Sequence, residues 1–252
     1  MRLQLNDYCM AEDGLEGRMV LISGATDGIG EALALACAAL GAQLVLMSRN
    51  KQKLESLCTK LQETTGQAHL YYAIDHRRAG EVDYLKFAEF LSKQDRPLDS
   101  LVVNAGHIAA LQGLRNYPLE TWLRTVTVNQ HAAFLLARSC IPALELSEDP
   151  SIVFSNHDCN SAYWGAYAVA KSAVLGLMEV LAQELDGDKP IRVNGVDPAP
   201  VRTKLRTAHF PGVHPHTYPA PDQVIAPYLY FIGPDSQGTT GINYKVNPDY
   251  SG

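Results

Sequence analysis

The sequence predicts a single-domain α/β fold, in which a doubly wound parallel sheet of about seven strands is flanked by helices. Two observations carry this prediction. Short, almost wholly apolar runs alternate with longer stretches of helical periodicity, and such runs are typical of parallel strands that are buried on both faces. A glycine-rich turn stands between the first of these runs and the first helical stretch. Right-handed crossovers between the strands would then give a Rossmann-like sheet.

Each expected element is a segment whose periodicity stands out from its neighbours. The expected strands are the apolar, β-rich runs 19–23, 43–48, 69–74, 98–104, 151–155, 191–196 and 241–246. The expected helices are the longer periodic stretches 28–40, 51–64, 82–93, 118–146, 165–185 and 220–232. The segment 197–221 is the least regular part of the chain and is rich in proline and histidine.

Length and composition narrow the class of protein. The 252 residues suit one domain spanning 1–252, and a hydrophobic share of 46% is enough for a core. A net charge of −6 argues against nucleic acid as a partner. The five cysteines are odd in number and form no Cys-x-x-Cys pair, which is typical of reduced thiols in the cytoplasm. The acidic first residues and the shortness of the apolar run 32–42 predict neither a leader nor a membrane segment.

The glycine-rich turn predicts a dinucleotide site. A pyrophosphate is bound by backbone N–H groups at a helix N-terminus, where side chains must not intrude. Gly24 would allow the sharp turn, Gly28 the close approach of the phosphates, and Gly30 tight packing of the helix on the strand. The alternative is an ordinary glycine-rich turn. The candidate cofactor-binding residues of this segment are Ser23, Gly24, Thr26, Asp27, Gly28, Ile29 and Gly30.

The end of the second strand bears on the choice of dinucleotide. An acid there would bind the ribose hydroxyls of NAD, but the chain has Arg49, which could pair with a 2′-phosphate. We therefore expect NADP, with NAD as a second possibility; the alternative is a solvated surface arginine. Asp75, after the third strand, could accept a hydrogen bond from the adenine amino group, or it could be a loop or N-cap aspartate.

Tyr167 and Lys171 form the candidate acid/base pair. Their i, i+4 spacing places both side chains on one face of a helix. A nearby ammonium, together with an oxidised nicotinamide, would lower the pKa of the phenol and so favour its use as an acid or base near neutral pH. Pairs with this spacing are usually structural, and this one gains weight from its place downstream of the nucleotide turn.

These motifs together resemble the short-chain dehydrogenase/reductase family across nearly the whole chain. The matching motifs are the glycine turn, Asn104-Ala105-Gly106, Val128-Asn129, Tyr167-x-x-x-Lys171, Arg192-Val193-Asn194, Asp197-Pro198 and Thr203. Three further stretches are similar to the bacterial YciK-type subgroup: 146–149, 162–167 and 228–230.

The resemblance implies a role for each matching residue. Asn104, Ala105 and Gly106 would line the adenosine ribose, and Asn129 would hold a water in a proton relay to Lys171. Lys171 would also bind the nicotinamide ribose. The residues that would position the nicotinamide carboxamide are Pro198, Val201 and Thr203. The resemblance also implies a homodimer or homotetramer.

The chain departs from the family where a catalytic serine is expected after the fifth strand. Counted from the strand, His157 takes the place of the serine; counted back from Tyr167, Ser155 does. We favour His157, whose neutral imidazole can donate a hydrogen bond, against the alternative of a loop histidine. Ala199 replaces a glycine beside the nicotinamide. The pair His214 and His216 lacks a third ligand at a recognisable spacing, so we expect no metal.

The leading hypothesis is therefore reversible hydride transfer between NADP(H) and a small carbonyl or alcohol substrate, with Tyr167 as the acid/base. The alternative is a nucleotide-binding protein that has lost turnover and acts as a scaffold or redox sensor. The intact glycine turn fits both hypotheses, whereas the altered segment 155–161 favours the second.

Overall fold

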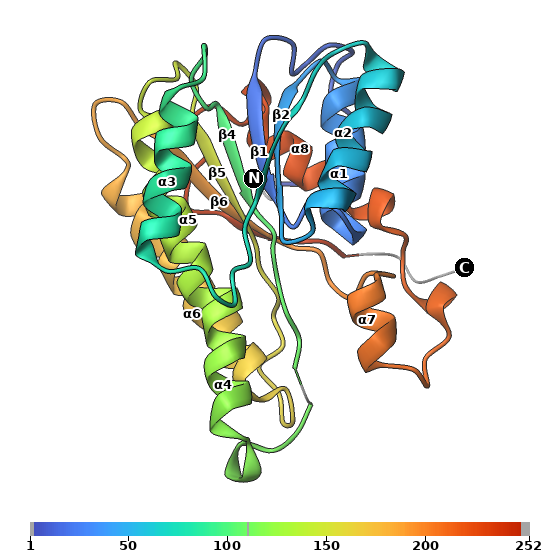
Figure 1. Cartoon of the computed structure of the whole chain (residues 1–252). Helices are drawn as coiled ribbons and strands as arrows, with labels where there is room; N and C mark the ends of the chain where they lie inside the picture. Colours follow the sequence, from blue (N-terminus) through green and yellow to red (C-terminus); the bar gives the residue numbers. More distant parts are fainter. Residues whose placement is uncertain (1–2, 110, 248–252) are drawn as a thin grey trace.

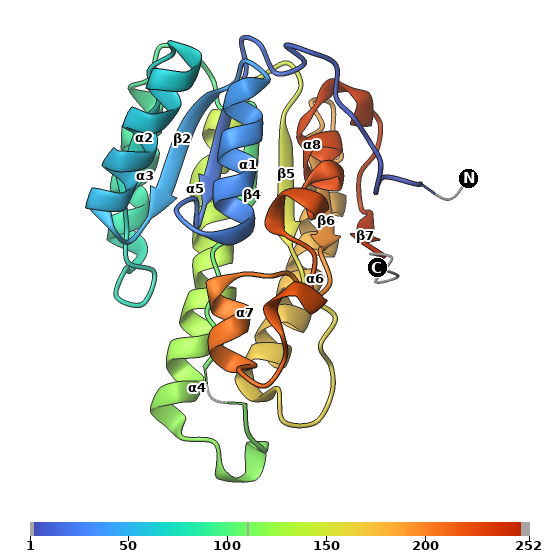
Figure 2. The same cartoon turned by 90° about the vertical axis from the view of Figure 1, so that its right-hand side faces the viewer.

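The computed structural model describes residues 3–109 and 111–247. In this part of the chain a parallel sheet of seven strands has the order β3-β2-β1-β4-β5-β6-β7. Helices cover both of its faces (Figures 1 and 2). The direction of winding reverses between β1 and β4, and ligands of doubly wound sheets bind outside the carboxyl ends of the strands at such a point. The predicted α/β fold is confirmed.

The strands lie close to their predicted positions. They are β1 (Met19–Ser23), β2 (Gln43–Ser48), β3 (Leu70–Ala73), β4 (Ser100–Val103), β5 (Ser151–Ser155), β6 (Arg192–Asp197) and β7 (Asn243–Lys245). The α-helices are α1 (Gly28–Ala39), α2 (Lys51–Thr65), α3 (Glu81–Ser92), α4 (Leu119–Val126), α5 (Ala132–Leu144), α6 (Gly165–Glu184), α7 (Lys204–His209) and α8 (Ala226–Ile232).

The long helix predicted over 118–146 is wrong as one continuous element. A π-helical turn, Thr127–His131, separates α4 from α5. The side chain of Asn129 lies in this turn and donates hydrogen bonds to the carbonyls of Thr125 and His107, each over 2.8 Å. A side chain that competes for helical carbonyls interrupts the regular hydrogen-bond ladder, and a π-turn is the result.

Two further differences lie towards the C-terminus. The stretch predicted as a helix over 220–232 begins with a 3₁₀ turn, Pro221–Val224, before α8 starts. The irregular segment 197–221 contains α7, a helix that the sequence did not predict. Thr203 caps it by accepting a hydrogen bond from the backbone N–H of Arg206. Six residues are too few for helical periodicity to stand out from a loop.

The core lies in two layers, one on each face of the sheet. One layer packs α1, α2 and α8 against the sheet, and the other packs α3, α5 and α6. Successive residues of β1 alternate between the layers, since Val20 and Ile22 contact the first while Met19 and Leu21 contact the second. In the described ranges α6 alone is long and apolar enough to cross a membrane, and half of its most apolar window is buried, as in a core helix.

Candidate active site

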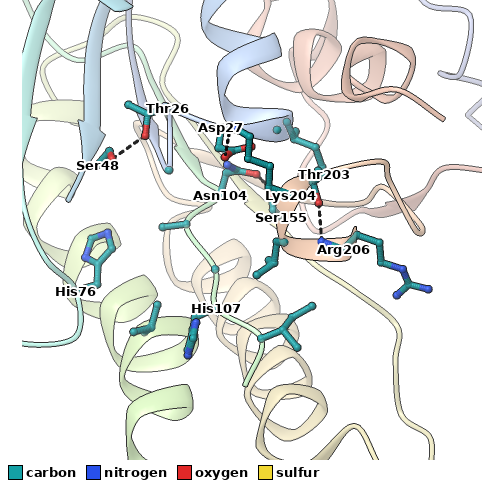
Figure 3. A pocket seen from close by; sticks show the side chains of 18 of the residues that line it. Thr26, Asp27, Ser48, His76, Asn104, His107, Ser155, Thr203, Lys204 and Arg206 are labelled. Atoms are coloured by element: carbon teal, nitrogen blue, oxygen red, sulfur yellow. Dashed lines mark hydrogen bonds and ion pairs between the residues drawn. The ribbon is translucent and has the colours of Figure 1, made fainter. Parts of the chain in front are cut away.

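A cavity of about 550 Å³ lies at the carboxyl ends of the central strands. It extends from the turn before α1 and the end of β2 to the loop after β5, α6 and α7. In Figure 3, Ser48 and His76 lie on one side of this cavity and Arg206 lies on the other. Both the candidate nucleotide residues and the candidate acid/base pair therefore meet one continuous space.

The glycine turn has the shape that a phosphate group requires. Gly24 has a φ of +69°, a conformation that favours glycine. A Cβ on Gly30 would lie 2.2 Å from the carbonyl oxygen of Gly24, so the helix could not pack this closely with any side chain there. Asp27 is the N-cap of α1, but its side chain makes no capping hydrogen bond. The first backbone N–H groups of α1 therefore donate no hydrogen bond to the side chain of the N-cap residue.

Two residues of the predicted cofactor set support the turn from behind. Gly24, Thr26, Asp27, Gly28 and Ile29 line the cavity, whereas Ser23 and Gly30 do not. The hydroxyl of Ser23 accepts hydrogen bonds from the backbone N–H groups of Asn104 and Ala105, over 2.9 and 3.1 Å. It thereby joins the end of β1 to the segment after β4.

Basic side chains gather at the end of the cavity near β2 and β3. Arg49, Lys53 and Arg77 line it there, together with Asp75. The guanidinium of Arg77 binds both carboxylate oxygens of Asp75 and holds the pKa of that carboxyl at about 2. In the described ranges the side chain of Arg49 makes no hydrogen bond or ion pair, although its charge also helps to lower the pKa of Asp75.

Tyr167 and Lys171 lie together on α6, as predicted from their spacing. The ammonium of Lys171 is 5.9 Å from the centroid of the Tyr167 ring and donates a 2.6 Å hydrogen bond to the backbone carbonyl of Ser155. Both side chains are more than nine-tenths buried. Burial lowers the pKa of Lys171 to about 8, because a charged ammonium is poorly solvated there.

The expected lowering of the Tyr167 pKa depends on an oxidised nicotinamide as well as on Lys171, and it stays a prediction; the protein's own groups act in the opposite direction. Burial raises the pKa of this phenol well above its usual range. The reason is that a phenolate here loses its water, and the nearby buried groups Cys159 and Asp197 also disfavour a negative charge. Tyr167 therefore keeps its proton across the neutral range.

Asn129 lies behind the cavity wall. It does not line the cavity, and its side-chain oxygen accepts a 3.0 Å hydrogen bond from the backbone N–H of His107. With its two donated bonds to the carbonyls of Thr125 and His107, this side chain fixes the loop after β4 against the helix. Its role in a proton relay stays a prediction.

Ser155 and His157, the two candidates for the place of the serine, have different surroundings. The hydroxyl of Ser155 is buried and contacts the side-chain oxygen of Asn104 at 3.1 Å and the hydroxyl of Tyr228 at 2.9 Å. The ring of His157 lies 5.8 Å from that of Tyr167 and makes no hydrogen bond within the described residues. Burial lowers the pKa of His157 to about 4, so its ring is neutral. Both residues line the cavity, but only His157 has free ring nitrogens to offer.

The segment after β6 closes the cavity from the other side. Pro198, Ala199, Val201 and Thr203 all line it. Ala199 has a φ of +57°, a strained value for alanine, at the place where the sequence resemblance implies glycine. The Cγ2 atom of Thr203 would lie 2.8 Å from a Cβ on Gly28, so this segment packs directly on the glycine turn.

Arg206 and His107 are among the lining side chains that sequence reasoning missed. Arg206 comes from the unpredicted α7 and lies against the ring of Trp164. His107 follows the Asn104-Ala105-Gly106 motif, and its Nε2 atom is buried without a hydrogen-bond partner in the described ranges. Thr203, a residue type that commonly caps helices, was a local pattern that could have drawn attention to α7.

Comparison with known proteins assigns the family. The family model described as short chain dehydrogenase matches residues 18–213. The chain belongs to the short chain dehydrogenase family.

Individual relatives agree with this assignment. The uncharacterized oxidoreductase YciK of Escherichia coli (strain K12) is 31% identical, with 96% of each chain covered. The crystal structure of the short chain dehydrogenase from Shigella flexneri has a TM-score of 0.94 and 30% identity, covering 98% of this chain and 97% of that one. A structure from Escherichia coli CFT073, complexed with NADPH, has a TM-score of 0.90 and 31% identity, covering 94% of this chain and all of that one. The predicted resemblance to the family and to the YciK-type subgroup is confirmed.

Proposed function

We propose that this protein is an NADP(H)-dependent oxidoreductase that interconverts a carbonyl and an alcohol, with Tyr167 as the proton donor or acceptor. One observation carries the proposal. The buried pair Tyr167 and Lys171 faces the same cavity as a glycine turn that opens a helix. A site of this kind places a proton donor at a fixed distance from a bound dinucleotide.

The residues of the cavity fit a dinucleotide. Gly24 and Gly28 leave the backbone of the turn open, and the first turn of α1 offers N–H groups to a pyrophosphate. Arg49 and Lys53 at the β2 end suit the 2′-phosphate that distinguishes NADP from NAD. The relative from Escherichia coli CFT073 complexed with NADPH supports the same preference. NAD is the second candidate.

When bound, the reduced cofactor would supply the hydride that reduces the carbonyl carbon. The residues of this chain transfer the proton. Tyr167 holds its proton at neutral pH and can donate it to the carbonyl oxygen. The ammonium of Lys171 lies close enough to stabilise the phenolate that remains. A ring N–H of His157 can hydrogen-bond the same carbonyl oxygen as its negative charge develops.

The alternative, nucleotide binding without turnover, rests on the altered segment 155–161 alone and has no support among the relatives. The relatives bear oxidoreductase and dehydrogenase names. The substituted position is filled by His157, a residue that can still donate a hydrogen bond.

Two measurements test the proposal. NADPH is titrated against the protein by fluorescence, and its oxidation is then followed with a panel of aldehydes and ketones. Tyr167→Phe should bind NADPH as tightly as the wild type but reduce the carbonyls about 10²- to 10⁴-fold more slowly. Tyr163→Phe is the matched control, because Tyr163 is 69% exposed and lies outside the cavity lining. If Tyr167→Phe turns over like the wild type, the assignment of the acid is wrong.

Two broader expectations accompany this function. We propose a homodimer or homotetramer, because α4 and α6 leave apolar side chains exposed, among them Leu119, Leu123 and Val180. We also propose a cytoplasmic location, which the five free cysteines of the described ranges support.

A further inference from the structure

Arg206 is a cation held among aromatic rings at the edge of the candidate active site. Its Cζ atom lies 3.7 Å from the ring centroid of Phe210, 4.8 Å from that of Tyr218 and 5.7 Å from that of Trp164. Its Nη2 atom donates a 3.0 Å hydrogen bond to the hydroxyl of Tyr218. Within the described residues, Nε and Nη1 have no hydrogen-bond partner, and no carboxylate pairs with this guanidinium.

Among the arginines that the structure describes, Arg206 is the one that lies over aromatic rings. Arg18, Arg77, Arg138 and Arg192 each form an ion pair with an aspartate or a glutamate. Arg206 instead lines the active-site cavity and also a second hollow that adjoins it beside Tyr218. A partly buried guanidinium with unused donors is poised to bind an anion.

The charges around the reacting end agree with an anionic ligand. The carboxylates that line the cavity are Asp27 and Asp75, which pair with Lys204 and Arg77. Asp197 lies nearby but does not line the cavity. Its two oxygens accept hydrogen bonds from the backbone N–H groups of Asp158 and Ala199. In the described lining, no acid therefore competes for Arg206.

The ring of Trp164 contacts both Arg206 and the proton donor Tyr167. The indole ring stacks on the ring of Tyr167 with centroids 5.9 Å apart, and Arg206 contacts it as well. The cavity lining beside Tyr167 is apolar at Ile108 and Leu205, which form one cluster with Tyr167, Cys159 and Trp164. A molecule whose carbonyl meets Tyr167 would therefore pass along an apolar wall before it reaches the guanidinium.

We propose that the substrate is a carbonyl acid, whose carboxylate binds Arg206 and whose carbonyl is separated from that carboxylate by an apolar spacer. This inference rests on the proposed function and names its substrate class. Arg206 is then a specificity-determining residue. The competing explanation is that Arg206 only fastens α7 and its loop to Trp164.

A pair of aldehydes that differ only in charge separates these explanations. The substrates are 4-formylbenzoate and its methyl ester, each reduced with NADPH. Wild-type protein should prefer the acid in kcat/KM. Arg206→Met keeps the apolar stem but removes the charge, and it should lose at least about 30-fold on the acid through KM, with the ester unchanged. Arg206→Lys should restore part of the preference. A purely structural role predicts equal losses on both aldehydes, and that result overturns the inference.

Arg202→Gln is the matched control. Arg202 lies on the same segment, contacts His216 and does not line the cavity. This variant should leave the preference for the acid intact, and equal effects of the two substitutions would contradict a specific role of Arg206.

A binding measurement keeps the inference testable if the protein reduces neither aldehyde. Binding of 4-formylbenzoate to the protein saturated with NADPH is followed by calorimetry. Binding that Arg206→Met abolishes would support the anion site while the proposed reduction fails. Equal binding by the wild type and Arg206→Met, or no binding by either, would overturn the site.

Discussion

The two ends of the cavity are built from different parts of the polypeptide. The nucleotide end depends on backbone shape: Gly24 turns with a positive φ, and Gly30 packs where a Cβ could not fit. The reacting end depends on side chains whose proton affinities are changed by burial, namely Tyr167, Lys171 and His157. Substitutions at the first end should therefore act through fit and affinity, and those at the second through charge and rate.

The largest effect in this comparison is expected at His157. His157→Ala should lower kcat about 100-fold, because the carbonyl oxygen loses a donor as its charge develops, with NADPH affinity unchanged. Ser155→Ala is the matched control. It should leave kcat nearly unchanged and cost about 1 kcal/mol of unfolding free energy, since this hydroxyl contacts Asn104 and Tyr228. Steady-state kinetics and denaturant unfolding measure both. The opposite pattern would show that Ser155 holds the place of the serine.

The same difference explains how much the sequence alone could predict. β1, β2 and β5 have their predicted bounds, and Tyr167 and Lys171 lie together, because local periodicity and spacing determine these features. The π-turn at Asn129 depends on a hydrogen bond to the distant residue His107, and α7 is too short for its periodicity to stand out from a loop. The direction of the Tyr167 pKa shift depends on how deeply the ring is buried, which spacing does not reveal.

Gly30 tests the dependence of the nucleotide end on shape. Gly30→Ala should lower the unfolding free energy by about 1–3 kcal/mol and weaken NADPH binding, because the new methyl group meets the Gly24 carbonyl and forces the turn apart. Gly176→Ala is the control. Apart from its chain neighbours and the backbone of α6 itself, no atom of the described residues lies within 4 Å of its added Cβ, and alanine should stabilise α6 by about 0.5–1 kcal/mol. Thermal unfolding and NADPH titration give the answer. Unchanged stability and NADPH affinity in Gly30→Ala would contradict the dependence of the nucleotide end on backbone shape.

Arg49 shows whether charge also matters at the nucleotide end. Arg49→Gln should weaken NADPH binding by about 10- to 100-fold, the loss expected when a charged hydrogen-bond donor is removed from a phosphate. NADH binding should not change, because NADH lacks the 2′-phosphate. Arg115→Gln is the control, since Arg115 is exposed and lies outside the cavity lining. Parallel fluorescence titrations with both nucleotides measure the effect. Equal weakening of the two would mean that Arg49 does not distinguish them.

A pH dependence is also expected at the reacting end. Burial lowers the pKa of Lys171 to about 8 and raises that of Tyr167, so the neutral protein holds an ammonium beside a protonated phenol. As pH rises above about 8 the ammonium loses its proton first, and the phenolate formed during reduction loses its stabilising charge. The kcat/KM for carbonyl reduction should therefore be level near neutral pH and fall by up to tenfold per pH unit above about 8. Lys171→Arg keeps its positive charge throughout this range, so its profile should stay level there even though its rate is lower. Two results would contradict this role of Lys171: a wild-type profile that is level to pH 10, or a fall above pH 8 that persists in Lys171→Arg. Lys171 would then have only the structural role of its hydrogen bond to the Ser155 carbonyl.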